Sequence, residues 1–465
     1  MTEAQHTTGR RGPDRAAVVV WLLWALTLAS LLGAIARDGR NVPFEEDWLL
    51  VGPMTGHEPN LPAWLWSQNS EHRLPLPRLV NLAILRTTGD FRWTMVFDTL
   101  AVGAVAAAMI LLARRLRGGR TSLADAFFPL LLLHLGHWDN LLWAWQIQFV
   151  LPTMLACVLL LVIVARPAPP AGWAAGLGGL ALIGLPLSGA NGLLFAPTLT
   201  AWLAYAAWEG RRDPATARGA GVWLPAAAAA LALVLCVAYF VGYEASPWNQ
   251  ASPGIGATLA TTGKLLALGL GPAAAKGWIL CGAAAVAVLL ISLGLLVIAY
   301  REDRDERLRI LGLLAFFAAA ALLALAIGWG RAGRAAETGR MSPRYVLLAV
   351  PGLCAAYFTA LLYAPGWTRR AIPVALATGL ALLFPLNTWM GLERRDWFEA
   401  GFAAFEHDLQ AGASKEDLAR RHHEFMLHWD EALMVTSLQQ LHDAGIGAFA
   451  AWQPEPAAPS GATAP

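Results

Sequence analysis

Charged residues are scarce in this sequence. Only 14% of its 465 residues are Asp, Glu, Lys or Arg, whereas a soluble domain averages about 25%. The formal net charge of +2 is too small to indicate a nucleic-acid partner, and we expect none. The apolar residues come in long blocks, so the length of the chain is no guide to a number of soluble domains.

Cysteine is also rare and forms no recognisable pattern. The four cysteines all fall inside apolar blocks: Cys157, Cys236, Cys281 and Cys354. Their spacing fits neither a disulfide framework nor a zinc site. His134 and His137 would share one helix face, but two histidines do not complete a metal site. The sequence therefore indicates no metal and no other cofactor, although its acidic residues are compatible with a divalent cation.

Apolar runs long enough to cross a bilayer are abundant. Hydrophobic residues make up 57% of the chain, and about 20 in succession span the hydrocarbon core. The first run, 16–36, is longer than the apolar part of a cleaved signal peptide, about 7–15 residues, and is interpreted as an uncleaved helix. We expect an all-α, polytopic transmembrane helix bundle of about eleven spans, near 16–36, 93–113, 122–137, 149–165, 171–187, 192–208, 220–242, 277–300, 310–329, 345–364 and 371–391.

Clusters of arginine predict the orientation of these spans. They are Arg114, Arg115, Arg117 and Arg120; Arg211, Arg212 and Arg218; Arg301, Arg304, Arg307 and Arg309; and Arg369 with Arg370. All four clusters fall on the side of the N-terminal arginines Arg10, Arg11 and Arg15, and basic residues in short loops stay cytoplasmic. We therefore expect a protein of the inner (cytoplasmic) membrane with a cytoplasmic N-terminus and an extracytoplasmic C-terminus.

The expected organisation has three parts. Residues 1–391 form the transmembrane domain, whose first outer loop, 37–92, carries mixed charges and many aromatic residues. Residues 392–453 form a small helical extracytoplasmic segment, with helical periodicity from about Trp397 to Leu441. Residues 454–465 are rich in Pro, Ala and Gly and are expected to be disordered.

The first cluster of polar residues follows the first span directly. Glu45, Glu46 and Asp47 are adjacent carboxylates, and they are followed by Trp48. Mutual repulsion near an apolar boundary raises the pKa of at least one of them. A carboxylate so placed can act as a general base or hold a cation. The alternative is a solvated group of loop charges.

Two further clusters combine arginine with other polar groups. One contains Glu71, His72 and Arg73, followed by Arg78; the other is Arg344-Tyr345 at the outer end of the tenth expected span. Arginine suits phosphate because its planar fork binds two oxygens at once. The alternatives are a capped turn before a helix near 74–85 for the first cluster and simple loop solvation for the second.

Polar residues also interrupt the apolar segments between the third and sixth expected spans. They are Trp138, Asp139, Asn140 and Gln146, together with Asn191. Ionisable residues at membrane depth are costly to bury and are usually functional. We interpret these residues as the polar lining of a cavity.

The acidic motif in a long outer loop after the first span resembles the multi-spanning GT-C glycosyltransferases. Glu46-Asp47-Trp48 is similar to the acidic-acidic-aromatic motif of uncharacterised bacterial members, although Glu46 stands where aspartate is commoner. The segment 69–73 is similar to an Asn-Glu-His-Arg stretch with Ser70 as an insertion, and the segment 342–345 resembles a late Arg-Tyr motif. The resemblance covers about residues 16–391.

The resemblance implies an inverting transfer of sugar from a polyprenyl-phosphate-linked donor. The acceptor would be a cell-envelope glycan, a lipid or a protein outside the cytoplasm. Asp47 or Glu46 would deprotonate the acceptor hydroxyl, while arginines hold the lipid phosphate. Other hypotheses are a multi-pass transporter, a lipid or polysaccharide flippase, a polysaccharide polymerase or ligase, and a non-catalytic scaffold.

Overall fold

Long apolar helices dominate the structure. The computed structural model describes residues 14–212, 220–246, 250–427 and 429–453. Within these ranges, eight helical stretches are long and apolar enough to cross a membrane. They contain α1 (Arg15–Asp38), α5 (Arg92–Leu116), α8 (Ile147–Ala165), α12 (Ala220–Tyr239), α14 (Trp278–Glu302), α15 (Arg307–Thr338), α16 (Val346–Tyr363) and α17 (Thr368–Gln410). The chain is therefore an all-α membrane bundle, as its apolar runs predict. Helices suit a lipid environment because their backbone N–H and C=O groups form hydrogen bonds within the helix.

The helices between these spans differ from the expected pattern. Shorter ones are α9 (Trp173–Gly184), α11 (Ala196–Arg212) and α13 (Ile255–Leu268), and they are joined by η5 (Pro186–Ser188), α10 (Ala190–Leu193), η6 (Pro272–Ala275) and η7 (Pro343–Tyr345). Helix α13 falls in the interval between the expected spans 220–242 and 277–300, where no span was expected. The count of eleven spans is thus not confirmed by the described residues, eight of whose helices meet the length of a span.

The expected span 122–137 is wrong as a continuous helix. Its residues and those that follow form η2 (Leu123–Ala126), α6 (Phe127–Leu132), η3 (Leu135–His137), α7 (Trp138–Leu141) and η4 (Ala144–Gln146). The chain breaks where Gly136 fits against Pro272, and a Cβ there would come within 2.9 Å of the proline ring. Gly391 of α17 packs on the backbone of Leu135, where a Cβ would clash. The broken segment is therefore held by close backbone contact with neighbouring elements.

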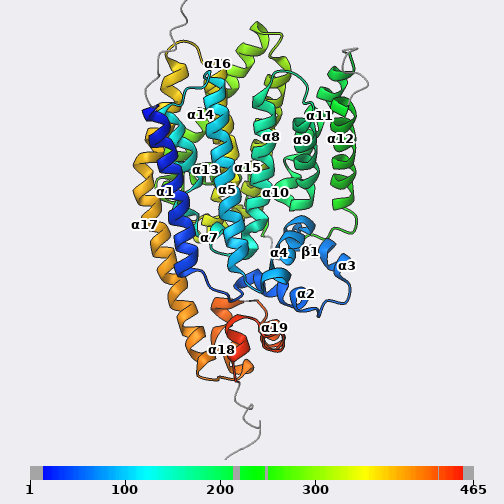
Figure 1. Cartoon of the computed structure of the whole chain (residues 1–465), viewed down its shortest axis with the longest axis vertical. Coiled ribbons are helices and arrows are strands. Elements are labelled where there is room, and N and C mark those ends of the chain that lie inside the picture. Colours follow the sequence, from blue (N-terminus) through cyan, green and yellow to red (C-terminus); the bar gives the residue numbers. More distant parts are fainter. Residues whose placement is uncertain (1–13, 213–219, 247–249, 428, 454–465) are drawn as a thin grey trace, which may run out of the picture.

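Residues 39–91 gather at one end of the bundle, which we call the loop end (Figure 1). They form η1 (Glu45–Leu50), α2 (Val51–Thr55), α3 (Leu61–Trp66), β1 (Gln68–Asn69), β2 (His72–Arg73) and α4 (Pro75–Thr88). The two strands pair antiparallel, with Gln68 opposite Arg73. Pro75 opens α4, because proline at a first helical position has no hydrogen bond to lose. The helix predicted near 74–85 is thus confirmed.

The opposite end of the bundle carries the arginine clusters that close α5 and open α15 and α17. Here the buried Asp125 accepts two hydrogen bonds from Arg117 Nη1, at 2.9 and 2.8 Å. Tyr357 Oη of α16 donates to the same carboxylate at 2.7 Å. A buried charge needs such partners, and this one ties α5, η2 and α16 together.

The C-terminal helices return to the loop end. Helix α17 runs without a break across residue 391, and α18 (Lys415–Met426), α19 (Glu431–Asp443) and η8 (Gly447–Ala451) follow it. Trp48 Nε1 donates to the Met426 carbonyl at 3.1 Å, and the Phe44 and Phe398 rings lie 4.8 Å apart. The segment 392–453 therefore packs on the acidic loop. The tail 454–465 lies outside the described residues.

Candidate functional site

The acidic motif forms a tight turn at the base of the bundle. Phe44 is extended and precedes the 3-10 helix η1, whose Asp47 Oδ2 accepts a hydrogen bond from the Phe44 amide at 3.2 Å. Asp47 is only 1% exposed, and Trp48 is fully buried. The apolar side chains of Phe44, Trp48 and Leu50 flank the acids in the sequence and are buried. Because these neighbours pack in the interior, Asp47 is buried as well.

Two positions at the loop end have a strained backbone, one in the acidic turn and one between β1 and β2. Glu45 has a φ of 49° and Ser70 a φ of 50°, in the left-handed region that side chains with a Cβ rarely adopt. They are the non-glycine residues in this conformation among those that the structure describes. Each such position costs about 1–3 kcal/mol and is found most often at functional sites. Both fall in motifs that the sequence singled out.

The surroundings of Asp47 favour its protonated form. Burial raises its pKa well above the usual value, and the neighbouring Glu46 charge raises it further. The amides of Phe44 and Trp145 act in the opposite direction by stabilising the carboxylate. Asp47 Oδ1 has no hydrogen-bond partner within the described ranges. A carboxyl group with a raised pKa and a free oxygen is suited to accept a proton.

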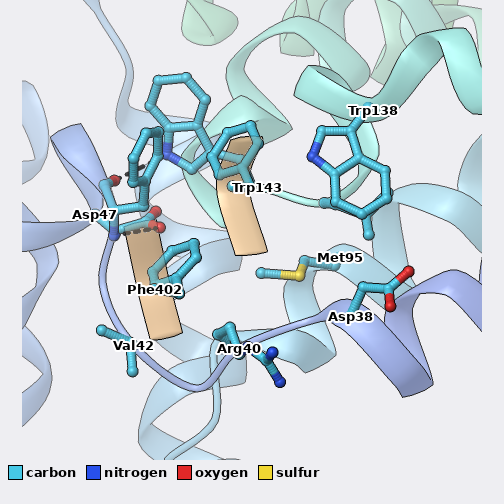
Figure 2. A pocket seen from close by; sticks show the side chains of 11 residues that line it. Asp38, Arg40, Val42, Asp47, Met95, Trp138, Trp143 and Phe402 are labelled. Carbon is cyan, nitrogen blue, oxygen red and sulfur yellow. Dashed lines mark hydrogen bonds between the residues drawn. The ribbon is translucent and has the colours of Figure 1, made fainter. Parts of the chain in front are cut away.

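Figure 2 shows the pocket beside this carboxyl group. Asp47 lies at one side and Trp138 at the other, with Trp143, Phe402 and Met95 between them. The pocket has room for about one water molecule. Its walls come from the end of α1, η1, α5, α7 and α17, so parts of the chain that are distant in sequence enclose the acid.

The late Arg-Tyr motif approaches the acidic turn. Arg344 interacts electrostatically with Glu46 and Asp139, and the Asn140 side chain donates to the Arg344 carbonyl at 2.8 Å. Within the described part of the chain, Arg344 Nε has no partner. Three of the polar clusters predicted from the sequence therefore meet at one place. Tyr345 lies beside them, its ring centroid 5.8 Å from Arg344 Cζ.

The cluster of Glu71 and His72 joins the same end from the hairpin β1–β2. Glu71 forms an ion pair with Arg331 of α15. His72 Nδ1 accepts from the Ala190 amide at 3.2 Å, beside Asn191. Burial lowers the pKa of His72 to about 4, so this imidazole is neutral at pH 7. Arg344 also acts electrostatically on His72, so the cluster lies near Arg344.

Arg73 and Arg78 have structural partners. Arg73 donates to the carbonyls of Trp66, Tyr239, Val241 and Gly242, each at 2.9 Å. Arg78 donates to the Ser67 carbonyl and hydroxyl at 2.8 Å and lies 4.8 Å from the Trp64 ring. Burial lowers the pKa of Arg78 to about 10. These guanidinium groups hold the outer segment together, which differs from the phosphate contact expected for Arg73.

The interrupted segment contributes several buried polar groups without partners. Trp138, Asp139, Asn140 and Gln146 are all buried. Across the described residues, neither amide atom of Gln146 finds a hydrogen bond, nor do Asn140 Oδ1 and Asn191 Nδ2. Each such group costs about 1–3 kcal/mol unless water or a ligand satisfies it. Of these residues, Trp138 lines the pocket beside Asp47, and a polar cavity lining by the others stays a prediction.

Sequence reasoning missed three charged residues at this end. Asp98 of α5 is fully buried, Arg331 pairs with Glu71, and Arg394 of α17 donates to Asp139 at 3.0 Å. A lone carboxylate inside the apolar run 93–113 was a visible signal for Asp98. Nothing in the sequence linked Arg394 to Asp139, because the two are 255 positions apart.

The described residues contain no group of three or more His, Cys, Asp or Glu side chains that could hold a metal ion. The rings of His134 and His137 are stacked 4.1 Å apart and lie in the broken segment. No protein-family model matches the chain, and no curated protein is significantly similar to it.

Proposed function

We propose that the protein is a membrane glycosyltransferase that transfers a sugar from a polyprenyl-phosphate-linked donor to an extracytoplasmic acceptor. The observation that carries this proposal is the convergence of Arg344 at the loop end with Asp139 and with Glu46, the residue beside Asp47. Transfer from such a donor needs a proton acceptor beside a cation that binds phosphate. A transporter would instead be expected to place its polar residues near the membrane midplane.

Asp47 is the better candidate for the general base. Its Oδ2 is held by the Phe44 amide, so the carboxyl group is oriented, while Oδ1 is free among the described contacts. A positioned carboxylate that takes the proton of an acceptor hydroxyl contributes about 10²–10⁴-fold to the rate. Glu46 remains the second candidate, because its Oε2 is also buried without a partner in the described structure.

Arg344 is the candidate that would hold the donor phosphate. Its guanidinium group interacts electrostatically with the carboxylates of Glu46 and Asp139. The planar shape of this group also suits two phosphate oxygens. As the sugar leaves, negative charge grows on this phosphate, so a fixed cation stabilises the transition state. Tyr345 and Trp138 offer aromatic faces against which a sugar ring can pack.

The orientation in the membrane is part of the proposal. We place the arginine end in the cytoplasm and the loop end outside an inner (cytoplasmic) membrane. The separation of the basic clusters from residues 39–91 along the bundle supports this orientation. The C-terminal segment would then cover the site from the outer side.

The test is the chemical phenotype of a deletion strain. Mass spectrometry of its lipid and glycan fractions should show one glycan lacking a sugar and a polyprenyl-phosphate-linked sugar accumulating. The wild-type gene and a Glu58→Gln variant, which changes an acid elsewhere in the same loop, should restore both. Accumulation of a complete but untransported glycan would overturn the proposal in favour of a flippase or transporter.

A further inference from the structure

Asp98 is a buried acid that the proposed reaction does not use. It lies on α5 near the loop end and is 0% exposed. Neither of its carboxylate oxygens has a hydrogen-bond partner among the described residues, and the hydroxyl of the next residue, Thr99, has none either. An ionised carboxylate in such a place would be strongly destabilising, so the group needs a proton or a ligand.

The charged group that acts on Asp98 is another acid. Among the described residues, the titratable group that interacts electrostatically with Asp98 is Asp47 of η1. Asp47 in turn feels the charge of Glu46. No Arg, His or Lys in the described structure compensates Asp98. Two buried carboxyl groups that repel each other cannot both be ionised at low cost.

Asp47 is arranged to complete such a pair. Its Oδ2 is held by the Phe44 amide at 3.2 Å, while its Oδ1 is unpartnered in the described part of the chain. Burial raises the pKa of Asp47 well above its usual value. Asp47 also lines one pocket with Met95 of α5, and Met95 lies on the same face of α5 as Asp98, one turn before it.

We propose that Asp98 and Asp47 together bind one proton, which resides on Asp98 when Asp47 is ionised and ready to act as a base. Asp98 is thus a positioning residue that acts through Asp47. Its bearing on sugar transfer rests on the proposed function, but the binding of the proton does not.

The proton balance of transfer follows directly. The acceptor oxygen forms a bond to the sugar carbon, the bond from that carbon to the phosphate oxygen breaks, and its electron pair stays on the lipid phosphate. The acceptor proton moves to Asp47, so that both carboxyl groups are neutral. Release of one proton to water restores the singly protonated pair. A neutral Asp98 therefore keeps the negative charge on Asp47, where the proton is accepted.

Infrared spectroscopy of the purified full-length protein in lipid nanodiscs tests this inference. The carbonyl stretch of a protonated carboxyl group is separate from that of a carboxylate. At pH 7 the wild type should show such a band, and Asp98→Asn should remove it. Asp98→Glu should keep the band at a changed frequency. The matched control is Asp125→Asn, which removes an equally buried acid that is paired with Arg117 and should leave the band intact.

A titration provides the second readout, which a merely structural role would not move. On acidification the wild-type pair should take up two protons in two separate steps, the first on Asp98 and the second on Asp47. Asp98→Asn should lose the first step and keep the second, because asparagine is neutral as protonated Asp98 is. An unchanged wild-type band in Asp98→Asn, or two titration steps that both persist in Asp98→Asn, would overturn the inference. Because no sugar donor is present, these results are independent of transfer. A shared proton in a protein that transfers no sugar would refute the proposed function alone.

Discussion

Replacing Arg344 should weaken binding of the donor while the protein still folds. Arg344 acts electrostatically on Glu46 and Asp139, and its Nε has no partner among the described atoms, so the guanidinium has capacity for an anion. One charge-assisted hydrogen bond contributes about 1.5–3 kcal/mol. Arg344→Ala should therefore weaken binding of a polyprenyl phosphate about ten- to a hundredfold, since about 1.4 kcal/mol is a factor of ten.

The assay is a titration of the purified protein in nanodiscs with a fluorescent polyprenyl phosphate. Arg344→Lys should recover only part of the loss, because lysine lacks the two-pronged geometry. Arg340→Ala changes an exposed arginine of the same loop and should bind nearly as the wild type does. If Arg344→Ala bound with unchanged affinity, the assignment of the phosphate to this guanidinium would be wrong.

Three further predictions concern topology, stability and pH. Reporter fusions should give a cytoplasmic signal after Arg117 and Arg307 and an external one after residue 400, whereas a cytoplasmic signal after 400 would contradict the proposed orientation. Arg73→Ala should lower the free energy of unfolding by at least about 2 kcal/mol, because four backbone carbonyls lose a charged donor; an unchanged thermal midpoint would argue against its structural role. Transfer should fall as the pH drops through the raised pKa of Asp47, since the protonated group cannot accept a proton, and an acidic limb near the ordinary aspartate value would rule out Asp47 as the base.

Much of the membrane fold follows from apolar run length. The runs near 16–36, 93–113, 277–300 and 310–329 each became a long helix. The run at 122–137 did not, because close contacts of Gly136 and Gly391 with neighbouring backbone and ring atoms favour a broken chain. Such contacts are tertiary and leave no local periodic signal. Helix α17 passes residue 391 because the polar residues that follow end the apolar run without ending helix propensity.

The sequence was enough to predict single residues of the candidate site, but not which of them lie close together. Asp47, Asp139 and Arg344 each stood out as a charged residue beside an apolar run, and this local signal is what sequence reasoning can detect. Their approach depends on how α7, η1 and η7 pack. Arg73 looked as suitable for phosphate as Arg344 did, and only its four carbonyl partners distinguish the two. Partners of a guanidinium group are set by folding across long distances in sequence.

The most direct test of the account is sugar transfer by the purified protein and its Asp47→Asn variant, alongside Glu46→Gln. Extracted polyprenyl-phosphate-linked sugars serve as donor, the glycan fraction of the deletion strain serves as acceptor, and donor binding is measured separately. One of the two variants, in our account Asp47→Asn, should lose at least about a hundredfold in transfer rate while it still folds and binds donor, and the matched Glu58→Gln should transfer normally. Near-normal transfer by both Asp47→Asn and Glu46→Gln would contradict the claim that this turn is the catalytic centre.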